Sequence, residues 1–76
     1  MTKTRFIEEC DNAAVNFMTD PATAHIQLKA LEPVFSERFE KDPKCVDAMV
    51  KAWKAEAAYI HACSQRAVGG PEGGAR

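Results

Sequence analysis

Glycine is almost absent from the chain, and its four glycines all lie between Gly69 and Gly74. Residues 1–68 therefore contain no glycine-rich loop of the kind that holds a nucleotide phosphate. The chain has no apolar run close to the ~20 residues of a membrane span, and its start, MTKTRFIEEC, lacks the apolar stretch of a signal peptide. Its three cysteines are not closely spaced, which fits a reducing compartment better than a disulfide-bonded secreted protein. We expect a cytoplasmic protein.

Neither sign of charge is in excess. Ten Lys and Arg residues stand against eleven Asp and Glu residues, which gives a net charge of -1. Phosphate contacts normally require a basic surplus, so this balance argues against a dedicated nucleic-acid binder. With 76 residues the chain is long enough for one domain. A domain this small buries only about 60% of its unfolded surface and often gains stability from a second subunit.

The stretch from Pro43 to Ala67 gives the clearest structural signal. Asp42 is a good N-cap and Pro43 suits the first helical position, where no backbone donor is needed. Apolar residues then recur at three- and four-residue spacing, which predicts an amphipathic helix with its inward face at Val46, Met49, Val50, Trp53, Ala57 and Ile60. The segment GGPEGGAR, residues 69–76, should end the helix and form a flexible tail.

Two further helical regions precede this helix. The first is expected from Thr4 to Met18, and the second begins at Asp20-Pro21 and continues to about Lys41 with a kink at Pro33. Because the connections are short, consecutive helices should run antiparallel. The sequence thus predicts an all-α domain over residues 1–68, a small three-helix antiparallel arrangement. Its expected core is Phe6, Cys10, Phe17, Leu28, Leu31, Phe35, Phe39, Val46, Met49, Val50, Trp53 and Ile60.

A second stripe of small residues lies roughly opposite the expected inward face of the long helix. It consists of Ala48, Ala52, Ala55, Tyr59 and Ala62. Alanine is the best helix former, so the stripe is compatible with ordinary exposed positions. Small side chains also let another helix approach closely, and a tyrosine offers an amphipathic anchor. We take these five residues as the candidate partner-binding site and expect a homodimer or a protein partner.

Residues that could carry chemistry are few. His61 and Cys63 are two residues apart and face away from each other on a helix, so they do not form a typical zinc pair. The sequence leaves open a tertiary site built from His25, His61 and one cysteine. Buried cysteine acting as a small hydrophobic residue is the commoner case for Cys10, Cys45 and Cys63. We therefore predict no metal, no cofactor and no enzymatic activity.

A row of lysines, which we call the lysine edge, suggests nucleic-acid binding as the alternative function. Lys44, Lys51 and Lys54 lie along one side of the long helix, but Asp47 interrupts them. A DNA-reading helix would also be expected to carry base-contacting Arg, Asn or Gln side chains along its length, and this one offers only Gln65 and Arg66, both near its end. A dimeric helical nucleic-acid-associated regulator is therefore the second hypothesis.

One segment resembles a known family. PVFSERFEKDP, Pro33 to Pro43, is similar to part of the small theta subunit of bacterial replicative polymerases, over 11 of the 76 residues. The resemblance implies a three-helix, non-catalytic stabilising subunit. The residues themselves predict the same class: a small helical interaction module that covers or stabilises a surface of a larger protein. An accessory subunit, a co-chaperone and a phage- or plasmid-type inhibitor all fit this description.

Overall fold

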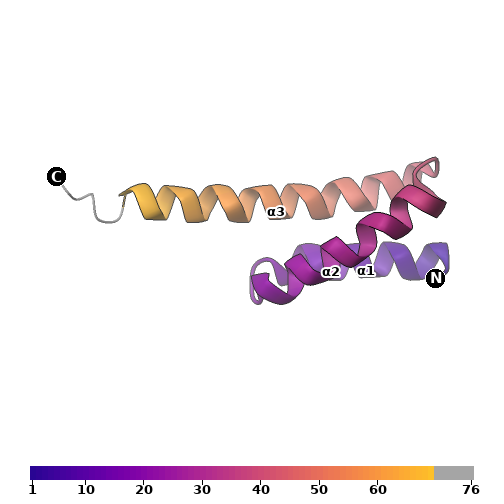
Figure 1. Cartoon of the computed structure of the whole chain (residues 1–76), viewed down its shortest axis with the longest axis horizontal. Helices are drawn as coiled ribbons and strands as arrows, with labels where there is room; N and C mark the ends of the chain where they lie inside the picture. Colours follow the sequence, from indigo (N-terminus) through magenta and orange to yellow (C-terminus); the bar gives the residue numbers. More distant parts are fainter. Residues whose placement is uncertain (70–76) are drawn as a thin grey trace.

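The computed structural model describes residues 1–69, and side chains are described up to Gln65. Helix α1 spans Lys3–Asn16, α2 spans Pro21–Val34, a π-helical turn η1 spans Phe35–Phe39, and α3 spans Pro43–Gly69. Consecutive helices reverse direction, so α1 and α3 run parallel with α2 antiparallel to both (Figure 1). We call α1 and α2 together the hairpin. The predicted all-α, three-helix fold is confirmed.

Each helix begins at a side chain that accepts hydrogen bonds from free backbone amides. Thr2 accepts from the amide of Arg5, and Asp20 accepts from the amide of Thr23. Asp42 accepts from the amides of Lys44 and Cys45. The two aspartate caps were predicted, whereas the Thr2 cap starts α1 one residue earlier than the sequence indicated. These caps fix where the chain turns, and so which residues stand at the two ends of the hairpin.

The middle helix continues through Pro33, as expected, but the irregularity takes a specific form. Pro33 has no amide hydrogen and its ring crowds the carbonyl one turn back. Directly after it, residues 35–39 form a π-helical turn, a wider coil that is found mostly as short insertions within α-helices. Phe35 and Phe39 at the ends of this turn both contact Phe6, with ring centroids 6.0 and 4.9 Å away.

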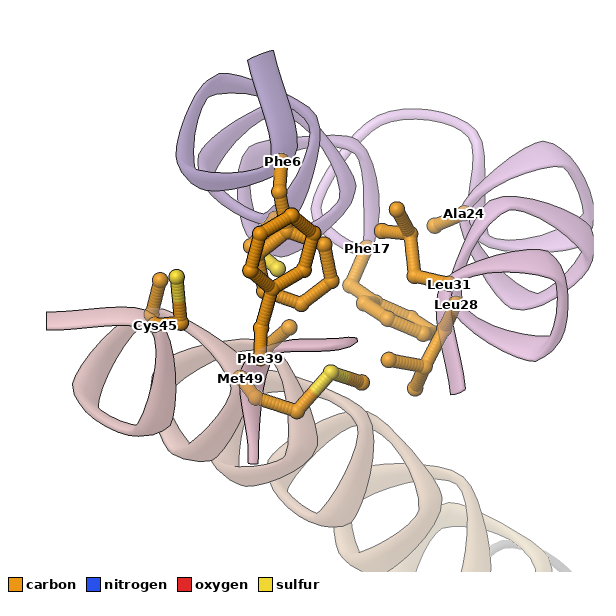
Figure 2. Packing of buried hydrophobic residues seen from close by; sticks show 11 residues of the cluster. Phe6, Phe17, Ala24, Leu28, Leu31, Phe39, Cys45 and Met49 are labelled. Carbon is orange, nitrogen blue, oxygen red and sulfur yellow. The ribbon is translucent and has the colours of Figure 1, made fainter. Parts of the chain in front are cut away.

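The core lies between α1 and the other two helices. Phe6, Cys10, Leu28 and Met49 are completely buried, and the labelled side chains of Figure 2 converge on this space. At the other end of the hairpin Phe17 is 5% exposed and its ring lies 6.1 Å from that of Tyr59. The predicted core residues of α1 and α2 are therefore confirmed, with Phe35 half-buried at the edge.

The inward face of α3 differs from the predicted one. Its buried residues are Cys45, Ala48, Met49 and Ala52. Val46 and Val50 are only half-buried, while Trp53 is 38% and Ile60 53% exposed, so four of the predicted core positions were wrong. Alanines allow the parallel helix α1 to approach closely, whereas an indole at the centre would hold it away. Trp53 instead lies at the edge, with its ring 5.8 Å from Phe35 in an edge-on contact.

Helix α3 runs past the α1–α2 turn (Figure 1). It ends at Gly69, which the sequence assigned to the tail, and the remainder of that predicted tail lies outside the described residues. Among the described helices, none combines the length and apolarity needed to cross a membrane.

Candidate functional site

An open apolar surface lies where α3 leaves the hairpin. Two adjacent hollows of about 610 and 530 Å³ meet there and share Phe17, Pro21 and Tyr59. We call them together the Tyr59 groove. Its α1–α2 side is formed by Ala14, Phe17, Met18, Pro21, Ala22, His25 and Ile26. Its α3 side is formed by Ala55, Glu56, Ala58, Tyr59, Ile60 and Ala62.

The α1–α2 turn explains why apolar side chains stand open here. Helix α1 ends at Asn16, the N-cap Asp20 follows four residues later, and α2 begins at Pro21, so the turn is tight. Asn16 Nδ2 donates to Gln27 Oε1 at 2.9 Å, which ties the two helices together beside the turn. Phe17 enters the core, and Met18 next to it points out and is 86% exposed.

Four of the seven exposed large apolar residues of the described chain line this groove. Met18, Ile26 and Ile60 are 86%, 69% and 53% exposed, and all three line it. Val15 is 60% exposed but lines neither hollow, so a substitution at Val15 is a control for substitutions in the groove. Scattered single apolar residues are normal on a protein surface, whereas a contiguous group around a hollow is typical of a binding surface.

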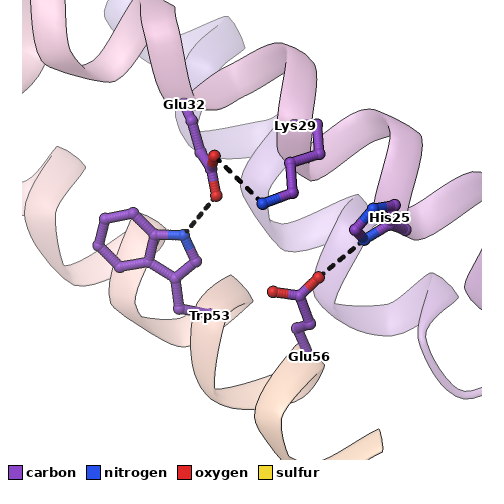
Figure 3. Close-up of polar contacts among 5 residues, drawn as sticks. All are labelled: His25, Lys29, Glu32, Trp53 and Glu56. Carbon is purple, nitrogen blue, oxygen red and sulfur yellow. Dashed lines mark hydrogen bonds and ion pairs between the residues drawn. The ribbon is translucent and has the colours of Figure 1, made fainter. Parts of the chain in front are cut away.

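Polar contacts join α2 to α3 along one side of the groove (Figure 3). His25 Nδ1 lies 2.9 Å from Glu56 Oε2, and Trp53 Nε1 donates to Glu32 Oε2 at 3.0 Å. Lys29 Nζ lies 3.6 Å from the other Glu32 oxygen. The first two contacts join α2 to α3 beside the hollow. His25 and Glu56 are the charged or chargeable residues that line the groove.

The predicted partner-binding stripe divides between the core and the groove. Ala48 is 6% exposed and Ala52 is completely buried, because α1 packs on them. Their assignment to a partner surface is therefore corrected: the helix that uses the small residues belongs to the same chain. Ala55 is half-buried, and together with Tyr59 and Ala62 it lines the groove.

Comparison with protein-family models, curated proteins and solved structures finds no match. The theta-subunit resemblance of residues 33–43 stays a prediction. In the structure this segment spans the end of α2, the turn η1 and the start of α3.

Sequence reasoning missed most of the groove. The sequence predicted Met18 as the last residue of the first helix, and Ile26 was not singled out. A signal existed for Ile26, because two residues before Leu28 it falls on the opposite side of α2 from the Leu28–Leu31 stripe. That Ile26, Met18 and Ile60 come together depends on the tertiary packing of all three helices.

The residues considered for chemistry are dispersed. Cys10 and Cys45 are buried, and desolvation raises the pKa of both thiols, that of Cys10 to about 11. Cys63 is half-buried and His61 is exposed on α3. Within residues 1–69 no group of three His, Cys, Asp or Glu side chains comes together in a way that could hold a metal ion.

Carboxylates lie among the lysines of the lysine edge. Lys51 Nζ lies 3.3 Å from Asp11 Oδ1 on the neighbouring helix. A shallow hollow of about 310 Å³ at this edge is lined by Lys44 and Lys51 but also by Asp11 and Asp47. Such an alternation of signs gives little net attraction for a phosphate backbone.

Proposed function

We propose that this protein is a helical interaction module that binds an amphipathic helix of a protein in the Tyr59 groove. The observation that carries the proposal is the gathering of Met18, Ile26 and Ile60 around two joined hollows. A groove with apolar walls and few polar groups suits the apolar face of a helix, which anchors through residues spaced three and four apart. The module acts by occupancy: it covers or stabilises the helix that it holds.

Contacts between the helices support the base of the groove, which favours binding without a large rearrangement. Phe17 and Tyr59 form an aromatic contact under the groove, and the His25–Glu56 contact fixes its wall. Preorganised walls lower the entropic cost of association. The three cysteines are free thiols, which supports a reducing, cytoplasmic compartment for this activity.

The proposal is tested with helical peptides displayed on phage and selected against the full chain. Selected sequences should carry apolar residues at helical spacing, and their affinity should be measured by fluorescence polarisation. Ile26→Asp places an unpaired carboxylate in the groove and should weaken binding by at least about tenfold. Val15→Asp changes a residue outside the groove that is exposed to a similar degree, 60% against 69% for Ile26, and should leave the affinity unchanged.

Two results would contradict the proposal. Selection that yields no helical binder would remove the groove as a helix site. Equal loss of affinity in Ile26→Asp and Val15→Asp would place the binding surface elsewhere.

A further inference from the structure

Glu56 is the carboxylate that lines the Tyr59 groove, and it belongs to the larger of the two hollows. Its side chain is 18% exposed, less than that of any other residue in the ion pairs formed among residues 1–65. His25 Nδ1 lies 2.9 Å from Glu56 Oε2, and an imidazole is charged only when it is protonated. A neutral His25 therefore leaves the charge of this carboxylate unbalanced.

A bound helix would remove the remaining water from Glu56. Covering the larger hollow with apolar side chains alone would bury an ionised carboxylate beside a neutral imidazole, which is costly. A Lys or Arg side chain from the bound helix replaces the lost water with a charge-assisted hydrogen bond, because a carboxylate can accept several donors. The larger hollow thus suits a helix that carries a cation.

The chain itself supplies no lysine or arginine to this place. The groove is formed entirely by parts of residues 6–28 and 55–65, and these two segments contain neither Lys nor Arg. The cation nearest in sequence to His25 is Lys29, which lies 3.6 Å from a Glu32 oxygen and outside the groove lining (Figure 3). A cation for Glu56 has to come from the partner.

The turn beside the groove adds a second negative charge. Asp20 caps α2 immediately before Pro21, and Pro21 lines both hollows. The smaller hollow itself is lined by no Asp, Glu, Lys, Arg or His. The groove therefore combines an apolar half with a half whose fixed charge is negative.

We infer that the Tyr59 groove selects a basic amphipathic helix of another protein, with a Lys or Arg on Glu56 and apolar side chains in both hollows. This inference rests on the proposed function and adds the charge of the partner helix. Because only the larger hollow holds a carboxylate, the contact with Glu56 also fixes the register of the bound helix. The basic residue should stand three or four positions from an apolar anchor, on the same helical face.

The first test selects helical peptides on the full wild-type chain from a phage library that holds acidic and basic residues in equal numbers. A Lys or Arg should recur at one fixed spacing from the apolar anchors. Selection on Glu56→Gln, which keeps the side-chain size and an oxygen that can accept from His25, should lose this preference. Acidic and basic residues at equal frequency in the peptides selected on wild type would overturn the inference.

The second test measures the pairing with a double-mutant cycle, using one selected peptide and fluorescence polarisation. Glu56→Gln, checked for native helicity by circular dichroism, should weaken binding at least about fivefold, and so should Gln in place of the basic residue of the peptide. Both changes together should weaken binding no more than either alone. Losses that multiply would mean that Glu56 and the basic residue act separately, which would overturn the inference.

Glu37→Gln is the matched control for charge. Glu37 is exposed on η1 and lies outside the groove lining, so its substitution changes the net charge by the same amount without touching the groove. The affinity for the basic peptide should stay at the wild-type value. A loss as large as that of Glu56→Gln would mean that the peptide responds to net charge alone, against the inference.

The outcomes separate this inference from the proposed function. Helical peptides that depend on Ile26 but carry no basic residue leave the helix site standing and overturn only the assigned charge. A selection without any helical binder overturns both. A chain that forms a dimer by sedimentation, lost in Ile26→Asp, assigns the groove to a second copy and also overturns the inference.

Discussion

The packing of α1 on the alanines of α3 predicts a large penalty for enlarging one of them. Ala52 is completely buried, so Ala52→Leu inserts three extra carbon atoms where no space is open. Overpacking of this kind costs about 1–3 kcal/mol in well-packed cores. Ala57 lies on the same helix but is exposed, and Ala57→Leu should change the free energy of unfolding by less than about 0.5 kcal/mol.

This difference is large relative to the stability of such a domain. At about 0.05–0.15 kcal/mol per residue a chain of this size has a free energy of unfolding of about 4–11 kcal/mol. One kcal/mol shifts the melting temperature of a small domain by about 4–8 °C, so Ala52→Leu should melt at least about 4 °C lower.

The assay is urea unfolding at one fixed protein concentration, followed by circular dichroism and by the fluorescence of Trp53. A fixed concentration removes the contribution of self-association to the apparent stability. The reasoning would be refuted if Ala52→Leu were as stable as Ala57→Leu. That result would mean that α1 does not cover Ala52 and that the alanine stripe is open to a partner.

Two further predictions concern titratable groups. In the native protein at neutral pH a thiol reagent should modify Cys63 and leave Cys10 and Cys45 unmodified. The reason is that Cys10 and Cys45 are buried, and burial raises the pKa of their thiols. Mass spectrometry that detects fast modification of all three cysteines would contradict the buried core. The hydrogen bond from Lys3 lowers the pKa of Asp42 below its ordinary 3.8, so its contribution to stability is complete above that pH and is lost as the pH falls through the lower folded value. Urea midpoints between about pH 5 and pH 2 should therefore fall less in Asp42→Asn than in wild type, and parallel curves for the two proteins would contradict this linkage.

Local signals in the sequence predicted the helices and their starts. Asp20 and Asp42 before proline specify helix starts through hydrogen bonds within three residues, so no tertiary information is needed. The effect of Pro33 was also local, although the π-helical form of the irregularity was not foreseen.

The face of α3 that enters the core could not be read from α3 alone. The large apolar stripe with Trp53 and the alanine stripe with Ala52 are both compatible with burial. Which of the two stripes is buried depends on how closely α1 packs against α3, and these two helices are distant in the sequence. The Tyr59 groove was missed for the same reason, since Met18, Ile26 and Ile60 come from three different elements.

The most direct test of the account is a methyl NMR titration of the full chain with a selected helical peptide. The central claim is that the Tyr59 groove holds a helix. It predicts that the methyl signals of Met18, Ile26 and Ile60 shift, while that of Val15, exposed but outside the groove, stays in place. Shifts at Val15, or at Val46 and Val50 on the half-buried side of α3, with the groove methyls unchanged, would contradict it.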